Sequence, residues 1–169
     1  GVREPFQIFP GIFVPAGSYN NVEVQPVMMT NQGRAVSLNL QTNFGGFFSG
    51  HRKTISPTLR FRAGQQLTGE VSYQRNDVDL PQGDFVTNLV RTRLSFSFTP
   101  RMFVQSLVQY NDRADVWSMN LRLGWLQAAN TGLFVVYNDT RGLYDLRPTP
   151  ERQDRSLVIK FSRMFDLLQ

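Results

Sequence analysis

The stretch RTRLSFSFTPRMFVQSLVQYN, residues 91–111, holds two runs of alternating side chains joined by a short turn. In the first run, Leu94, Phe96 and Phe98 alternate with Arg93 and Ser95. Because successive side chains of a strand leave the backbone on opposite sides, this spacing predicts a strand with one apolar and one polar face. In a soluble barrel the apolar face points inward. In a membrane barrel the same face points outward to lipid.

The same alternation recurs along most of the chain, and no helical pattern of useful length interrupts it. We expect one domain over residues 1–169, with an N-terminal segment at 1–18 and a meander of about nine strands over 19–165. Residues 5–14 either add a further strand, or strands from outside this chain complete the sheet. The expected strands lie at 19–30, 36–44, 54–63, 67–74, 90–98, 102–110, 117–125, 133–137 and 157–165.

The connections between these strands alternate in length. Short connections are expected at 31–34, 63–66, 99–101 and 128–132, and longer ones at 45–53, 75–84, 111–115 and 138–154. An up-and-down meander places alternate connections at opposite ends of the sheet. Tight periplasmic turns and longer extracellular loops are typical of outer-membrane barrels, so the pattern favours a membrane barrel over a soluble one.

The composition narrows the function classes. The chain has 14 Phe, 5 Tyr and 2 Trp, but only 18% charged residues and no cysteine, which leaves neither a disulfide framework nor a thiolate metal site. The net charge of +5 comes from scattered basic residues rather than a patch, so we expect no nucleic-acid partner. No apolar run is long enough for a transmembrane helix, and the N-terminus lacks the pattern of a signal peptide.

Three further features favour an outer-membrane barrel. The apolar faces are about nine to eleven residues long, as a tilted membrane strand requires. Aromatic residues gather near the strand ends, as in interfacial girdles. The final amphipathic strand contains Phe161 and Phe165, which are candidates for the C-terminal signal that the barrel-assembly machinery recognises.

Four segments carry a resemblance to a known family: NDVDLPQGDF, LVRTRLSFSFTPRMFVQSLVQYN, NLRLGWLQAANTGLFVVYND and RSLVIKFSRMFDL. They resemble the C-terminal outer-membrane β-barrel domain, a domain of unknown function, of bacterial proteins that carry an N-terminal carbohydrate-binding-like module of the family 9 type. The similarity covers residues 10–167 and is most specific over 77–139. It implies that this chain is the C-terminal portion of a longer protein, and it transfers neither sugar-binding nor catalytic residues.

If lipid lies outside, the polar side chains form a lumen. Its cationic character would favour anionic solutes, unless the arginines stack with neighbouring polar groups in a filled interior. The expected lumen-facing residues are Arg60, Arg62, Glu70, Arg91, Arg93, Arg122 and Lys160.

Catalysis and metal binding have weak support in the sequence. His51 is the only histidine, and Ser49 lies two residues before it in an expected loop, but a triad needs a third group that the sequence does not place. Asp77, Asp79 and Asp84 could offer oxygen ligands to calcium, although they lack the spacing of an EF-hand. We therefore expect no enzyme activity and no cofactor.

The interpretation is an antiparallel up-and-down transmembrane β-barrel, or the C-terminal part of a larger one, in the bacterial outer membrane. It would act as a porin-like passive pore or as a structural and binding platform. Its partners would be the lipid bilayer, the assembly machinery, and other strands or subunits that complete the barrel. Two alternatives stay open: a soluble ligand-binding β-barrel, and an outer-membrane hydrolase with an extracellular site near His51.

Overall fold

The computed structural model describes residues 1–128, 131–142 and 151–163 of the chain. Every regular element in these residues is a β-strand, and none of them forms a helix that could cross a membrane. The strands are β1 Phe6–Phe9, β2 Ile12–Val14, β3 Glu23–Val24, β4 Val27–Met29, β5 Val36–Phe47, β6 Gly50–Ala63, β7 Leu67–Leu80, β8 Gly83–Thr99, β9 Met102–Asn111, β10 Val116–Ala128, β11 Thr131–Gly142 and β12 Glu151–Ser162.

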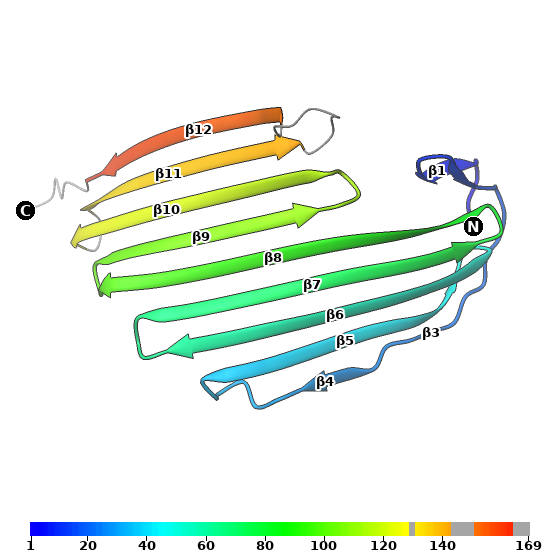
Figure 1. Cartoon of the computed structure of the whole chain (residues 1–169), viewed down its shortest axis with the longest axis horizontal. Coiled ribbons are helices and arrows are strands. Elements are labelled where there is room, and N and C mark those ends of the chain that lie inside the picture. Colours follow the sequence, from blue (N-terminus) through cyan, green and yellow to red (C-terminus); the bar gives the residue numbers. More distant parts are fainter. Residues whose placement is uncertain (129–130, 143–150, 164–169) are drawn as a thin grey trace, which may run out of the picture.

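Ten strands form one antiparallel sheet in which each long strand pairs with the next along the chain (Figure 1). The order runs from β12 through β11, β10 and so on to β5, and the two short strands β3 and β4 both pair with β5. This confirms the expected all-β, antiparallel, up-and-down arrangement. Among the described residues β12 has no partner on its outer side, and the sheet is open. Closure into a barrel is therefore a proposal.

The strand registers give the sheet two chemically different faces. Residues directly opposite one another in an antiparallel ladder share a face, and the face alternates at each step along a strand. One ladder joins Leu59, Val71 and Thr92, and the neighbouring ladder joins Arg60, Glu70 and Arg93. We call the first side the apolar face and the second the polar face.

Two expected long loops are wrong. Residues 45–53 and 75–84 are mostly strand, with turns of only two residues at 48–49 and 81–82. The glycines and aspartates there resemble turn signals. However, His51 and Asp79 still pair in the β6–β7 ladder, and Asp79 pairs with Asp84 in the β7–β8 ladder. The strands thus extend beyond the apolar part of the sheet, and the described connections are short at both ends.

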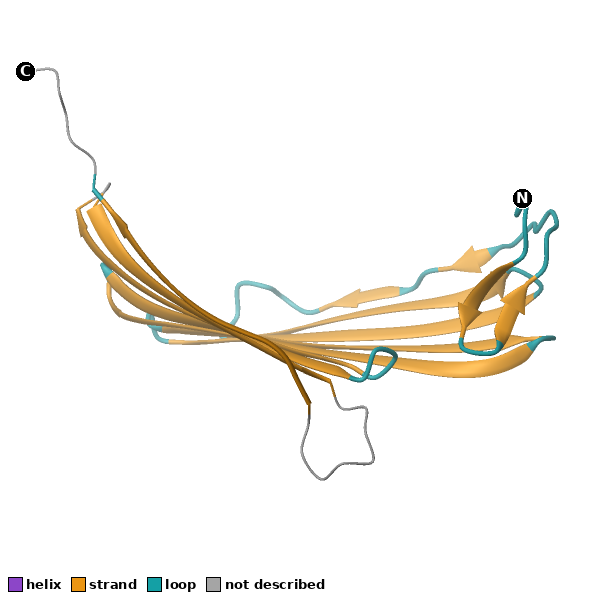
Figure 2. Ribbon diagram, turned by 90° about the horizontal axis from the view of Figure 1, so that it is seen from above, coloured by secondary structure: helices purple, strands orange, loops and turns teal. Residues whose placement is uncertain are grey.

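Near the N-terminus the chain departs from the expected single strand at 19–30. Pro26 separates β3 from β4, because proline has no N–H to donate to the ladder. Residues 5–14 do not join the large sheet, since β1 and β2 pair only with each other. Figure 2 shows this hairpin lying over one end of the strongly twisted sheet.

The most buried apolar residues lie where the hairpin packs against the polar face of the sheet. Ile12 and Val14 of β2 contact Val78 and Leu80 at the end of β7. The Phe9 ring stacks on Phe85 at 4.5 Å between centroids. The Arg113 guanidinium, in the β9–β10 turn, donates to the backbone oxygen of Ile8 at 2.8 Å. This apolar cluster, and not the long apolar face, is the buried core of the described chain.

Candidate functional site

The polar face carries all of the residues expected to line a lumen. Arg60, Glu70 and Arg93 share one ladder, and Arg62 lies in the next ladder with Thr68 and Ser95. The other three expected residues, Arg91, Arg122 and Lys160, occupy the same face at greater distance along the strands or across the sheet.

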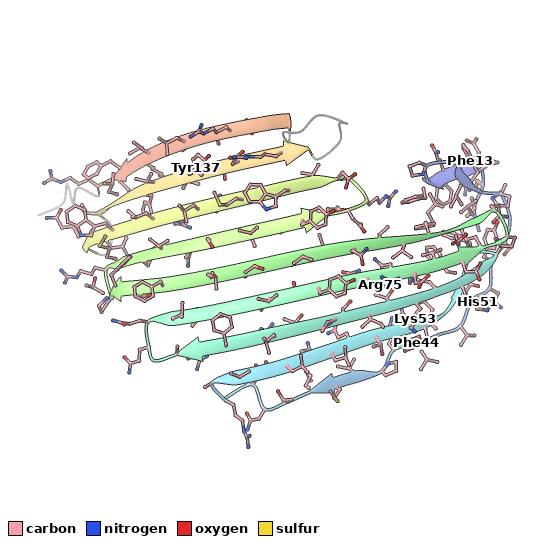
Figure 3. The ribbon with its side chains drawn as sticks, viewed as in Figure 1. Phe13, Phe44, His51, Lys53, Arg75 and Tyr137 are labelled. Carbon is pink, nitrogen blue, oxygen red and sulfur yellow. The ribbon has the colours of Figure 1, made fainter. Side chains whose placement is uncertain are left out.

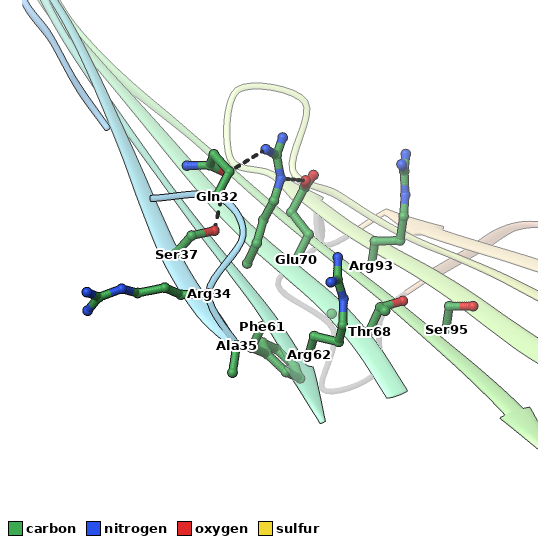
Figure 4. Close-up of a pocket in the computed structure, with 12 residues that line it drawn as sticks. Gln32, Arg34, Ala35, Ser37, Phe61, Arg62, Thr68, Glu70, Arg93 and Ser95 are labelled. Carbon is green, nitrogen blue, oxygen red and sulfur yellow. Dashed lines mark hydrogen bonds and ion pairs between the residues drawn. The ribbon is translucent and has the colours of Figure 1, made fainter. Parts of the chain in front are cut away.

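Only part of this set lines a common cavity. A cavity of about 220 Å³ lies over β6, β7 and β8, beside the segment that joins β4 to β5 (Figure 4). Its charged lining consists of four arginines and one glutamate, Arg34, Arg60, Arg62, Arg93 and Glu70. Cationic side chains therefore outnumber the carboxylate around this space.

Arg60 is held in place by two acceptors. Its Nε donates to Glu70 Oε2 at 2.7 Å, and its Nη1 donates to Gln32 Oε1 at 3.2 Å. Gln32 Oε1 also accepts from the Ser37 hydroxyl at 3.2 Å. Glu70, the single carboxylate that the described residues contribute to the cavity, is thus already paired. The ion pair is exposed enough that its contribution to stability is small.

The guanidinium groups of Arg62 and Arg93 have no hydrogen-bond or ion-pair partner within the described residues. Both side chains extend to the same side of the sheet as Glu70 (Figure 4). The hydroxyls of Thr68 and Ser95 lie in the same ladder as Arg62. The cavity therefore offers unused donors of two kinds, guanidinium and hydroxyl.

Arg91 lies two residues before Arg93 on the same face and directly opposite Ser72 and Gln109. Its Nε is buried without a hydrogen-bond partner. Arg122 is four strands away from Arg60 and packs over the rings of Phe134 and Phe103, at 5.0 and 5.9 Å. Lys160 is exposed on the edge strand β12. The structure thus separates Arg122 and Lys160 from the cavity.

The apolar face is uncovered and bounded by aromatic side chains at both ends. Phe44, Tyr73, Tyr110, Trp117 and Tyr137 end it on one side, and Phe61, Phe96, Phe98, Trp125 and Phe161 on the other. Between these ends the apolar face of the described strands carries no Asp, Glu, Lys or Arg. Many of its large side chains are exposed, among them Trp125 at 55% and Ile159 at 66%, and others are half-buried.

Charged residues begin directly beyond the first aromatic end. Lys53, Arg141 and Arg155 lie over the rings of Phe44, Trp117 and Tyr137 at 5.8, 5.7 and 5.3 Å. Asp139, which is 1% exposed, accepts hydrogen bonds from Tyr137 and Arg141. The boundary between the apolar and charged parts of this face is therefore sharp.

The apolar band runs obliquely across the strands. The ladder that starts at Leu38 in β5 reaches the charged residue Asp139 in β11, six strands later. On β5 the apolar run is centred on Leu40, which is displaced from this ladder toward the 48–49 turn. On β11 it is centred on Val135, which is displaced from the ladder toward the opposite end of the sheet. Figure 3 shows the result: Phe44 and Tyr137, which end the band on these two strands, lie far apart along the strand direction.

This displacement gives the angle between the band and the strands. It amounts to about one residue per strand, which is about 3.3 Å along the strand for every 4.8 Å across it. The band is therefore perpendicular to an axis from which the strands tilt by about 35°. A tilt of this size is typical of closed β-barrels.

The three aspartates suggested for calcium do not form a metal site. Asp79 and Asp84 are direct ladder partners, whereas Asp77 lies about 7 Å further along its extended strand. Asp77 is 3.9 Å from Arg75, measured between Oδ2 and Nη2. No group of three or more His, Asp or Glu side chains in the described chain could hold a metal ion.

His51 and Ser49 do not form a catalytic pair. His51 lies in β6 rather than in the expected loop, opposite Asp79 and Gly46. The Ser49 hydroxyl donates to Gln82 Oε1 at 3.1 Å. Nothing in the described residues orients these two side chains toward each other.

Phe161, one of the two residues of the expected assembly signal, lies on edge strand β12 opposite Leu133 and is 66% exposed. Phe165 lies outside the described residues. The assembly signal stays a prediction.

A second charged contact joins the edge of the sheet to β6. Glu23 in β3 accepts hydrogen bonds from Asn43 at 2.9 Å and from Arg52 at 2.8 Å. The hydrogen bond from Asn43, followed by the charge and the hydrogen bond of Arg52, lowers the pKa of Glu23 below its ordinary value of 4.5, against an opposing effect of burial. Both groups lie beyond the apolar band, at the end of the sheet near the 48–49 turn.

We expect the Glu23 carboxyl to titrate with a midpoint below 4.5, and Asn43→Ala to raise that midpoint. Because the folded-state pKa is lowered, the contact favours the folded state above the ordinary glutamate pKa and loses this effect as the pH falls through the folded value. An NMR titration of the side-chain carboxyl measures both midpoints. Asn39→Ala is the control, since Asn39 lies on the same strand away from Glu23. A wild-type midpoint at or above 4.5 would contradict the expectation.

Comparisons of the chain with protein-family models, with curated proteins and with solved structures find no match. The resemblance to barrel domains that follow a carbohydrate-binding-like module therefore stays a prediction. The function has to be argued from the two faces of the sheet.

Several residues of the cavity were not expected from the sequence. Gln32 and Arg34 belong to the turn before β5, and Thr68 and Ser95 are ordinary polar residues of an alternating strand. The β6–β7 and β7–β8 registers bring Thr68 and Ser95 beside Arg62 and Arg93. The sequence gives one indication of this grouping: Thr68 and Ser95 alternate with apolar residues in the same way as the arginines, which places them on the polar face.

Proposed function

We propose that the sheet is the wall of a bacterial outer-membrane β-barrel that acts as a passive pore or as a structural and binding platform. The oblique apolar band carries this proposal. A face that stays apolar over eight neighbouring strands, and that crosses them at the tilt of a barrel, suits the hydrocarbon layer of a membrane. In this arrangement the polar face lines the lumen.

The dimensions of the band support the proposal. Trp117 and Trp125 end it on β10, and eight residues of strand span about 26 Å. At a tilt of about 35° this corresponds to roughly 21 Å along the membrane normal, close to the apolar band of about 25 Å in known outer-membrane barrels. The aromatic ends would then lie at the two membrane interfaces.

The alternatives fit these observations less well. A soluble ligand-binding barrel would enclose the apolar face, but the packed N-terminal hairpin lies on the polar face. A hydrolase near His51 is less well supported, because the hydroxyl of Ser49, the nucleophile suggested by the sequence, donates to Gln82. The barrel itself would be closed by pairing of the β12 edge with the β3–β4 edge, or with strands from another segment or subunit. The lipid bilayer and the assembly machinery are its proposed partners.

Tryptophan fluorescence tests the membrane orientation, because the chain contains only two tryptophans. We expect Trp117→Phe and Trp125→Phe, which leave one tryptophan each, to be quenched in vesicles of brominated lipids. Bromine near the headgroup should quench more than bromine at the chain ends, since both rings are proposed to lie at interfaces.

The matched control places a tryptophan on the other face. Ser118→Trp in the Trp117→Phe/Trp125→Phe background moves the fluorophore by one residue to the polar face. This variant should escape quenching by either lipid. Equal quenching on both faces, or none on the apolar face of correctly folded protein, would overturn the proposal.

A further inference from the structure

We propose that the cavity over β6, β7 and β8 binds a small solute that carries two or more carboxylate or phosphate groups. The inference rests on the proposed function in one respect, namely that the polar face lines a lumen through which the solute reaches the cavity. The binding chemistry itself depends only on the residues around the cavity.

The charge balance of the cavity selects anions. Glu70, the one carboxylate among the described residues that line it, is paired with Arg60, and Arg60 also donates to Gln32 (Figure 4). Arg62 and Arg93 face the same space with no partner among the described residues. Each guanidinium presents a planar fork of donors that matches the two oxygens of a carboxylate or phosphate.

The spacing of these donors points to more than one anionic group. Arg62 and Arg93 lie on β6 and β8, with β7 between them, and Arg93 is two residues along β8 from Ser95 in the ladder of Arg62. Their backbones are therefore about 10 Å apart across the strands and about 7 Å along them, or about 12 Å in all. Thr68 and Ser95 supply hydroxyls in the ladder of Arg62. A solute with anionic groups at two ends can engage one fork with each end, and neither side chain then has to bend toward the other.

Two other parts of the polar face have side chains that hydrogen-bond to one another across the strands. Thr54, Asn76 and Thr87 form a hydrogen-bonded ladder across β6, β7 and β8. Asn138 similarly bonds to Asn120 and Ser156 across β10, β11 and β12. In those regions polar side chains satisfy one another. The cavity instead gathers unpaired cations around one paired carboxylate, which is the arrangement that an anionic ligand would complete.

The cavity suits a small ligand. Its volume of about 220 Å³ would admit a small organic acid or a short phosphate ester.

Titration calorimetry with citrate and inorganic phosphate tests the site, using the full chain folded in a zwitterionic detergent without phosphate, at constant ionic strength. We expect saturable binding of citrate, tighter than binding of phosphate, and at least a tenfold loss of citrate affinity in Arg62→Gln/Arg93→Gln. Glu70→Gln removes the competing carboxylate and should raise the affinity severalfold. Arg75→Gln, which removes the same charge from the apolar face beyond the band, should leave it within about twofold.

The outcomes separate the site from the membrane proposal. Arg101 lies in the turn between β8 and β9 and is not among the residues that line the cavity. Equal losses in Arg75→Gln/Arg101→Gln and in Arg62→Gln/Arg93→Gln would indicate attraction to overall charge and overturn the site. Absence of saturable citrate binding in protein with a native β-sheet spectrum would do the same. A chain that folds in water without detergent and binds citrate with the expected dependence would support the site and overturn the membrane proposal.

Discussion

Replacing Leu121 by arginine should lower the free energy of unfolding in a lipid bilayer by about 2–4 kcal/mol, the cost of a basic side chain at the middle of a barrel's lipid-facing surface. Leu121 lies midway between Trp117 and Trp125 on β10, and it is 38% exposed on the apolar face. The folding equilibrium constant would fall by roughly thirty- to a thousandfold. Denaturant titration of protein folded into vesicles measures the change.

Two matched variants identify the cause of this loss. Ser118→Arg adds the same side chain to the same strand on the polar face, where Arg122 already lies, and should cost little. Tyr110→Arg places the charge at the end of the band, where the cost should fall to about 0–1 kcal/mol. In a bilayer the cost follows depth, whereas in a packed protein core it follows burial. Similar losses at Leu121 and Tyr110 would therefore contradict a lipid-facing surface.

The all-β meander could be predicted from the sequence because one residue in two is apolar along each strand. In β5, Leu38 and Leu40 alternate with Ser37 and Asn39, and this period alone identifies a strand and its two faces. The same argument placed Arg60 and Arg93 on the face where the structure has them. Local alternation is sufficient for both conclusions.

The ends of the strands could not be predicted, because the alternation disappears where both faces become polar. His51 and Asp79 look like loop residues in the sequence, yet backbone hydrogen bonds continue past them without an apolar face. Val78 and Leu80 break the expected pattern for a different reason: the N-terminal hairpin, which is distant in sequence, covers them. An apolar residue in the sequence indicates a buried position. It does not indicate that the N-terminal hairpin is the element that buries Val78 and Leu80.

Two further features could be found only from the strand registers of the structure: the oblique course of the apolar band and the set of residues that line the cavity. Leu38 and Asp139 share a ladder only through seven strands, and no local pattern encodes that relation. For the same reason Arg122 looks equivalent to Arg62 in the sequence. In the structure, Arg62 lines the cavity, while Arg122 lies against Phe134.

Replacing Val14 by aspartate should detach the N-terminal hairpin from the sheet while leaving the sheet folded. Val14 is fully buried, at 0% exposed, among Ile12, Val78 and Leu80, so a carboxylate there would lack both water and a partner. An unpaired buried charge costs several kcal/mol, and a two-stranded hairpin is at best marginally stable alone. Hydrogen exchange should show at least a hundredfold loss of protection over residues 6–14, with β5–β10 still protected.

The neighbouring residue provides the control for this prediction. Phe13 lies on the opposite side of β2 and is 53% exposed, so Phe13→Asp makes the same charge change without entering the apolar cluster. Protection over residues 6–14 should then fall by less than about tenfold, because the contacts of Val14, the Phe9–Phe85 stack and the Arg113–Ile8 hydrogen bond are retained. If Val14→Asp kept its protection, or if both variants lost it equally, the hairpin would not be held by its apolar cluster. A hairpin released only by Val14→Asp would instead be an element docked on the polar face, in the position to narrow one mouth of the proposed lumen.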